Sequence, residues 1–251
     1  MSTTYVTASS AHTTSTTEPA PHGLHGAAFS RTTMLLVAGG SVGSLLFMVV
    51  YLIEGATRLG YVTLQQPISA LSLGPGGWMQ QVNFIIFGLI SLCAALGWRR
   101  ALAPGAGAVA YPILRVIEAI GLIGDGFFSQ DPARGYPLGV SAAVTPSMHA
   151  IIHTCFAVVS ITAIALSCFV LAWRFAHEPR WRAWTFFVVV VGLLTMVFIA
   201  IFGSLNAQPG SLAGLFERLA TAGSMLLGLL VVARLLLDRR GARLAAWRQG
   251  K

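Results

Sequence analysis

Charged side chains are scarce in this chain. They make up 10% of its 251 residues, whereas 55% of the residues are hydrophobic and the mean hydropathy is +0.75. A soluble fold would need a core larger than a chain of this length can cover with so few charges. The shortage of charge therefore excludes an ordinary soluble domain and indicates a protein surrounded by lipid.

Cysteine and lysine are scarce as well. Lysine occurs once, at Lys251, and the arginines that supply the other positive charges are typical of a GC-rich bacterial genome. The three cysteines lie inside apolar stretches and form no Cys-x-x-Cys pair, which is typical of small buried hydrophobic residues. Their placement excludes a disulfide framework and a cysteine-based zinc site.

The chain does contain six apolar stretches, each long enough to cross a bilayer. A hydrocarbon core of about 30 Å requires about 20 helical residues. The stretches are too continuous for the alternating strands of a β-barrel, and lipid offers the backbone no hydrogen-bond partners, so each must be a helix. We therefore expect an all-α fold, a six-helix transmembrane bundle over residues 33–237, with spans at Met34–Ile53, Val82–Trp98, Ala108–Phe127, Ala150–Trp173, Ala183–Gly203 and Leu219–Leu237.

The two ends of the chain differ from this bundle in composition. Residues 1–32 are rich in Ser, Thr, Ala, His and Pro without a periodic apolar pattern, so we expect a disordered cytoplasmic tail. Residues 238–251 mix arginines with Leu244 and Trp247, which predicts a basic cytoplasmic tail that lies on the inner leaflet as a short amphipathic helix.

The net charge of +8 is distributed as in a membrane protein rather than a nucleic-acid-binding one. One side of the predicted bundle carries only Arg58, Arg134 and Arg218. The positive-inside rule places the other side, with both termini, in the cytoplasm, here at the bacterial plasma membrane. The expected partners are thus the lipid bilayer and its anionic headgroups, with no nucleic acid. The basic residues on the cytoplasmic side are Arg31, Arg99, Arg100, Arg174, Arg180, Arg182, Arg239, Arg240, Arg243, Arg248 and Lys251.

Ionisable residues gather at the predicted outer ends of the helices. Such groups are costly in a span and usually face the protein interior or a water-filled cavity. Glu118 and Asp125 share one face of the third span, about 10 Å apart along its axis. Arg115 lies three residues before Glu118, so we expect these two to form an ion pair. The members of the predicted polar cluster are Glu54, Ser69, Glu118, Asp125, Asp131, His149 and His153.

His149 and His153 are one helical turn apart and share a face. Three interpretations stay open for this pair: a divalent metal such as zinc with Asp131 as third ligand, a proton relay, or a structural hydrogen-bond network. His-x-x-x-His without a flanking glutamate is a weak metal motif, and the nearby acids strengthen it.

The first outer connection predicts a short interfacial helix. Pro67 begins it, its residues are Ile68–Leu73, and the glycine-rich run at 74–77 ends it. Ser69 on this helix is a conceivable nucleophile, although the sequence identifies no base beside it.

Small residues recur one turn apart in the first and last spans. They allow close helix packing within one bundle, and homo-oligomerisation is the alternative. The residues are Gly39, Gly40, Gly43 and Ser44 in the first span, and Ala220, Ser224 and Gly228 in the last.

Several short motifs resemble a known family. They are Pro67-Ile-Ser-Ala-Leu71 with Gly76-Gly-Trp78, then Asn83-Phe84 and, later, Asp131-Pro132 with His149-x-x-x-His153. Together they resemble the domain-of-unknown-function 998 family of bacterial multi-pass membrane proteins, over about residues 33–237. The resemblance implies no agreed activity; it marks Pro67, Ser69, Asp131, His149 and His153 as positions to examine. The usual Phe-Pro-x-Asp-Pro segment reads Phe128-Ser-Gln-Asp131-Pro132 here.

Two classes of function remain. The first is a non-catalytic protein with a transport-like, lipid-sensing or assembly role, whose outer polar cluster binds a proton, an ion or a headgroup. The second is a membrane-embedded, metal-dependent hydrolase or lipid-modifying enzyme that uses Asp131, His149 and His153. No motif is specific enough for an enzyme, so we favour the first class.

Overall fold

The structure is helical throughout the part of the chain that it describes. This computed structural model describes residues 29–133, 135–208 and 210–249, in which there are helices and no strand. The predicted all-α class is confirmed. Most of the predicted tail 1–32 lies outside the described residues. The α-helices are α1 (Arg31–Thr57), α2 (Gly77–Leu102), α3 (Ala110–Phe127), α4 (Met148–Ala176), α5 (Arg182–Leu205) and α6 (Ala213–Gln249), and a short 3-10 helix, η2, covers Ile68–Ser72.

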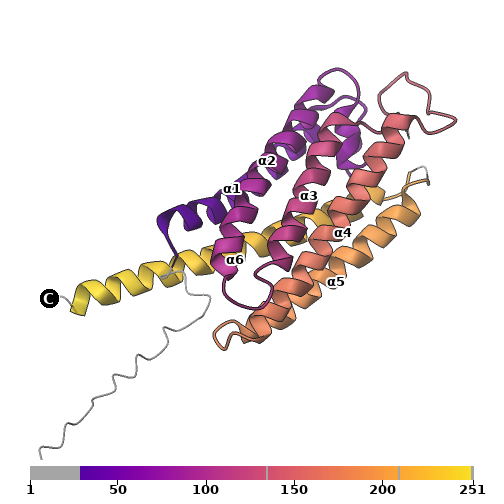
Figure 1. Cartoon of the computed structure of the whole chain (residues 1–251). Helices are drawn as coiled ribbons and strands as arrows, with labels where there is room; N and C mark the ends of the chain where they lie inside the picture. Colours follow the sequence, from indigo (N-terminus) through magenta and orange to yellow (C-terminus); the bar gives the residue numbers. More distant parts are fainter. Residues whose placement is uncertain (1–28, 134, 209, 250–251) are drawn as a thin grey trace, which may run out of the picture.

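Five of these helices are long and apolar enough to cross a membrane: α1, α2, α4, α5 and α6. The exception is α3, which has 18 residues and carries Arg115, Glu118 and Asp125 within that length. The last helix, α6, continues without a break through Asp238 to Gln249, and its basic end projects beyond the bundle (Figure 1).

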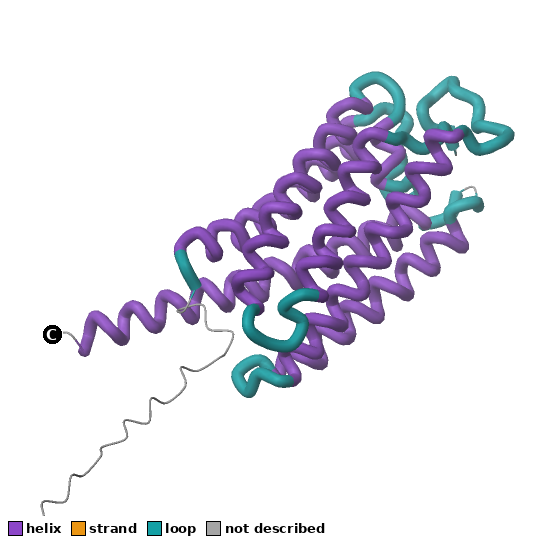
Figure 2. Tube along the Cα trace, viewed as in Figure 1, coloured by secondary structure: helices purple, strands orange, loops and turns teal. Residues whose placement is uncertain are grey.

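The helices form a closed ring in chain order. Each packs against the next one along the chain, and α6 packs against α1 to close the ring. Consecutive helices run in opposite directions, so the loops gather at two ends (Figure 2). We name the end where α1 finishes and α4 begins the upper end, and the end where α1 begins the lower end, where α6 also leaves the bundle (Figure 1).

Small residues make the close contacts between neighbouring helices. A Cβ added at Gly40 would lie 2.6 Å from Cβ of Ala94 on α2, and one at Gly121 would lie 2.6 Å from Cβ of Ser160 on α4. On α6, Ser224 and Gly228 line hollows inside the ring. Gly40 in the first span therefore serves packing within one bundle, as favoured from the sequence. In the last span a Cβ added at Gly228 would meet nothing within 4 Å, so close packing is not observed there.

The first upper loop folds over the end of the ring. Its 3-10 helix η2 lies where a short helix was expected, but all five of its residues are buried, and they pack against α1, α2 and α6. The loop also supplies hydrogen-bond acceptors to the first turn of α6. The backbone N–H of Leu215 donates to Leu64 O at 2.9 Å, and that of Gly214 donates to Gln65 O at 3.3 Å. These bonds satisfy donors that the first turn of a helix leaves unpaired.

Arg218 holds this loop from inside. Its buried guanidinium donates to Gln66 O at 3.0 Å and to Gly214 O at 2.9 Å, and also to the Tyr61 hydroxyl. The Tyr61 hydroxyl in turn donates to Pro67 O at 2.9 Å. Burial raises the pKa of Tyr61 above its ordinary value, so the phenol keeps its proton for that bond. The loop is thereby a fixed part of the upper end.

Candidate functional site

Three hollows lie one above another along the bundle, and the uppermost of them is open to the outside. The upper cavity, of about 400 Å³, lies between η2, α4, α5 and the start of α6. The middle chamber, of about 90 Å³, shares Ser69, His153 and Glu217 with it. The lower chamber, of about 60 Å³, shares Glu118 with the middle chamber and reaches down to Val37 and Val231. A line of polar groups therefore runs inside the bundle from the upper end toward the lower end.

Asp125 and His153 form the centre of the middle chamber. His153 Nδ1 lies 2.9 Å from Phe128 O and 3.2 Å from Asp125 Oδ1. A carbonyl oxygen only accepts, so Nδ1 carries the proton, and Nε2 of the neutral ring is an acceptor. Asp125 is buried, with 4% of its surface exposed, and its Oδ1 accepts no hydrogen bond from the described residues. A buried oxygen in this state favours a cation or a proton donor beside it.

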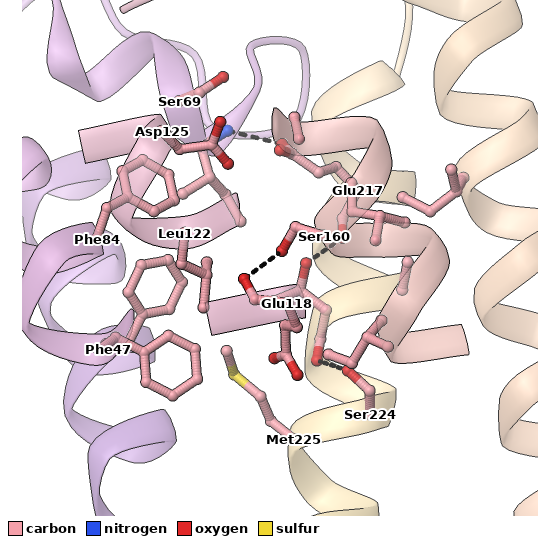
Figure 3. A pocket seen from close by; sticks show the side chains of 18 of the residues that line it. Phe47, Ser69, Phe84, Glu118, Leu122, Asp125, Ser160, Glu217, Ser224 and Met225 are labelled. Atoms are coloured by element: carbon pink, nitrogen blue, oxygen red, sulfur yellow. Dashed lines mark hydrogen bonds between the residues drawn. The ribbon is translucent and has the colours of Figure 1, made fainter. Parts of the chain in front are cut away.

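Glu217 faces Asp125 from the first turns of α6. Its Oε2 accepts a hydrogen bond from the backbone N–H of Ile68 at 2.7 Å, which ties η2 to the chamber. Figure 3 shows Glu217 on α6 across the chamber from Asp125, with Ser69 above them and Glu118 below. The Ser69 hydroxyl donates to Gln130 Oε1 at 2.7 Å, so it is held by an amide and not activated by a base.

Arg115 and Glu118 pair below this centre. Arg115 Nη1 lies 2.5 Å from Glu118 Oε2, which confirms the ion pair predicted from their spacing on one helix. The hydroxyl of Ser160 on α4 donates to Glu118 O at 3.1 Å. Glu118 is buried and Arg115 is partly buried, so the two charges compensate each other where water has little access.

Glu54 lies apart from the cavities. Its carboxylate is 3.5 Å from the guanidinium of Arg58, one turn later. The same guanidinium donates to Pro75 O at 2.5 Å and to Gly76 O. Glu54 and Arg58 therefore fasten the first upper loop, and Glu54 does not join the predicted cluster.

Asp131 and His149 lie near each other at the upper end, where α4 begins, and outside the middle chamber. Asp131 Oδ2 accepts a hydrogen bond from the backbone N–H of Ser147 at 2.7 Å, and Ser147 is the N-cap of α4. Hydrogen bonds from the side chain and the backbone of Ser147 lower the pKa of Asp131. His149 is exposed, and its ring lies 5.4 Å from the ring of Phe128.

The metal site expected from His149, His153 and Asp131 is not assembled. His149 is exposed, His153 is turned to Asp125, and Asp131 accepts a hydrogen bond from Ser147, the N-cap of α4. Within the described ranges, no three His, Cys, Asp or Glu side chains lie close enough together to hold a metal ion. The donor set thus does not fit zinc in this arrangement.

The site residue that the sequence interpretation missed is Glu217, and Arg218 beside it was assigned to a loop. The sixth span was expected to begin at Leu219, so both charges were placed outside it. Helix α6 begins earlier, at Ala213, and its first turns carry both residues into the upper end. A charged pair directly before an apolar run was the available signal.

The charges around the two upper hollows have one sign. Asp131 and Glu217 line the upper cavity, and Glu118, Asp125 and Glu217 line the middle chamber. No Lys or Arg of the described residues lines either hollow. The rest of the walls is mainly apolar, with Phe47, Phe84 and Phe87 around the middle chamber. Buried carboxylates in an apolar hollow with aromatic faces favour a guest that carries positive charge.

Comparison with known proteins identifies a family. The model described as "Protein of unknown function (DUF998)" matches residues 41–235, which is most of the chain. No curated protein and no solved structure matches. The chain therefore belongs to the DUF998 family, as its sequence motifs indicated.

Proposed function

We propose that this protein is a non-catalytic, transport-like membrane protein that binds a small amphiphilic cation. The observation that carries this proposal is the buried carboxylate of Asp125, whose Oδ1 accepts no hydrogen bond from the described residues. It faces Glu217 in a chamber that no Lys or Arg of the described residues lines. A cationic group satisfies Asp125 Oδ1 and balances the acids, while an apolar body lies against Ile161 and Phe202 of the upper cavity.

The sizes of the hollows support this division. Ligand cavities measure about 300–1,000 Å³, and the upper cavity of about 400 Å³ is in that range. The middle chamber of about 90 Å³ has room for an ammonium group or about three waters of about 30 Å³ each. The lower chamber is smaller still, at about 60 Å³. An organic cation therefore enters from the upper end and stops at the Arg115–Glu118 pair in this conformation.

The proposed setting is the bacterial plasma membrane, with six spans and both termini in the cytoplasm. The 18 residues of α3 reach about 27 Å as a helix, close to the thickness of a hydrocarbon core of about 30 Å. Its charges are directed to partners inside the ring, which lowers the cost of crossing. The excess of arginine at the lower end supports a cytoplasmic position for that end, so the upper cavity opens outward.

The alternative of a metal-dependent hydrolase has no comparable support. It requires Asp131, His149 and His153 around one ion, and these side chains contact three different partners. The Ser69 hydroxyl donates its hydrogen bond to the Gln130 amide oxygen and not to a base. The geometry thus favours binding over hydrolysis.

Binding of three matched small molecules tests the proposal. Purified full-length protein is titrated by calorimetry with phenethylammonium, 2-phenylethanol and phenylacetate, which share a phenyl group and differ in charge. We expect phenethylammonium to bind most tightly. Asp125→Asn should weaken its binding about 10- to 100-fold, because a hydrogen bond to a charged group contributes about 1.5–3 kcal/mol.

A matched control removes an acid elsewhere. Asp238 lies near the lower end, paired with Arg180 at 3.7 Å, so Asp238→Asn should leave the affinity unchanged. Equal affinity for the ammonium and the alcohol would contradict the proposal. So would an Asp125→Asn protein that keeps wild-type affinity while its melting temperature shows that it is folded.

A further inference from the structure

A fourth hollow lies at the lower end, far from the acid-lined cavities. It is an open groove of about 580 Å³ between the start of α1 and the end of α6. Figure 1 shows these two segments next to each other where α6 leaves the bundle. The groove is lined by Arg31, Met34 and Leu35 from α1 and by Leu236, Arg239, Arg240, Arg243 and Leu244 from α6.

The spacing of these residues explains how both helices serve one groove. On α6 they follow the pattern i, i+3, i+4, i+7, i+8, which is one face of a helix. On α1 they follow i, i+3, i+4. On α1, Arg31 lies at the chain end and Met34 and Leu35 lie toward the bundle, whereas on α6 the three arginines lie between Leu236 and Leu244. The groove is therefore amphiphilic along its length.

The positive charge of the groove has no counter-charge in the described part of the chain. None of its four arginines forms an ion pair with a described carboxylate, and no acidic side chain lines it. The acid nearest in sequence, Asp238, is paired with Arg180 instead. Four clustered guanidinium groups repel one another, so a bound anion is stabilising, and phosphate oxygens match the planar guanidinium fork.

The apolar part of the groove specifies the kind of anion. Leu35 is 73% exposed, Leu236 is 43% exposed and Leu244 is 51% exposed, next to the arginines. Arg31 precedes the apolar stretch of α1, and Arg239 follows that of α6, so both lie at the level where lipid headgroups meet the span. A nucleic acid or a free phosphate makes no use of these leucines.

We propose that this groove binds one anionic phospholipid. Its phosphate contacts the guanidinium groups of Arg239, Arg240 and Arg243 from α6 and of Arg31 from α1. An acyl chain extends along Leu35 and Leu236. The lipid thereby joins the first and last helices at the point where the ring closes.

Counting bound lipids tests this site. Full-length protein in detergent is titrated with phosphatidylglycerol or phosphatidylcholine of the same acyl chains, and bound lipids are resolved by native mass spectrometry. We expect one saturable phosphatidylglycerol site and no saturable phosphatidylcholine site. The triple variant Arg239→Gln/Arg240→Gln/Arg243→Gln should raise the apparent Kd for phosphatidylglycerol at least tenfold.

The matched control removes the same charge from the same end of the molecule. Arg99, Arg100 and Arg182 are exposed on α2 and α5, so their triple change to glutamine should leave the apparent Kd within about twofold of wild type. Equal losses of phosphatidylglycerol affinity in the two triple variants would show that diffuse electrostatic attraction holds the lipid. That result would overturn the proposal. Competition by inorganic phosphate as effective as the lipid, or equal binding of phosphatidylcholine, would also overturn it.

The second variant Leu35→Asn tests the acyl contact while all four arginines remain. It should weaken phosphatidylglycerol binding several-fold, and unchanged binding would contradict the lipid assignment. Melting temperatures measured without added lipid check that each variant is folded. Binding of phenethylammonium at the upper end should be the same in all of them, so this proposal and the proposed function fail independently.

Discussion

Replacing Gly214 by alanine should push the first upper loop away from α6. The added Cβ would lie 2.3 Å from Gln66 O and 2.7 Å from Thr63 O, whereas ordinary contact begins at 3.4 Å. Both obstacles are backbone oxygens, so no side chain can rotate to make room. The loop has to shift, and the bond from Ile68 N–H to Glu217 is lost with that shift.

The cost follows from two contributions. Overpacking costs about 1–3 kcal/mol, and a lost hydrogen bond to a charged acceptor costs about 1.5–3 kcal/mol. A total of about 2.5–6 kcal/mol should lower the melting temperature by about 5–24 °C for a chain of this size. Thermal unfolding in detergent, followed by circular dichroism, measures the change.

The same helix supplies the control. A Cβ at Gly223 meets nothing within 4 Å, so Gly223→Ala should leave the melting temperature unchanged or raise it slightly, because alanine favours a helix by up to about 1 kcal/mol. The Gly214→Ala protein should also lose affinity for phenethylammonium, since its loop forms one wall of the upper cavity. A Gly214→Ala protein as stable as wild type would refute the argument that this loop is fixed against α6.

Three further outcomes are expected. Glu118→Gln leaves Arg115 without its counter-charge and should destabilise the protein by about 3–5 kcal/mol. The double variant Arg115→Met/Glu118→Leu should recover most of that loss. Equal destabilisation in the two variants would contradict the pairing argument. Asp131 has a lowered pKa in the folded protein, so the stability that it contributes is complete at neutral pH and is lost as the pH falls through that pKa. The melting temperature, measured from pH 7 to pH 3, should therefore depend less on pH in Asp131→Asn than in the wild type. In a cysteine-free background, Ala142→Cys in the upper loop should react with an impermeant maleimide on whole cells and Pro179→Cys should not, and the reverse would invert the topology.

Local features of the fold were predictable from the sequence, because they depend on spacing along one helix. Apolar stretches of spanning length located all six helices, and the i, i+3 spacing of Arg115 and Glu118 predicted their ion pair. The closed ring was not predictable in this way. It depends on which helix faces meet, and α6 has to pack against both α5 and α1, two helices that lie at different distances along the chain.

The candidate site was predictable only where neighbouring segments were antiparallel. Helices α3 and α4 are consecutive and antiparallel, so their acids and histidines were expected to gather at one end of the bundle. Of these, Asp125 and His153 lie 3.2 Å apart. Glu217 comes from a helix far along the chain, and nothing in its local sequence indicates that η2 folds back to donate a hydrogen bond to it. Long-range contacts of this kind are decided by tertiary packing, which short motifs do not encode.

The two histidines show the limit of a helical motif most clearly. Spacing by four residues places His149 and His153 on one face of α4, but one turn also separates them by about 5.4 Å along the axis. At the level of His153, helix α3 is still present and supplies Asp125. At the level of His149 that helix has ended, and the nearest ring is that of Phe128, the residue that follows it. A shared face therefore yields one buried partner for Asp125 and one exposed histidine, because the depth at which the neighbouring helix ends decides which of the two lies inside the bundle.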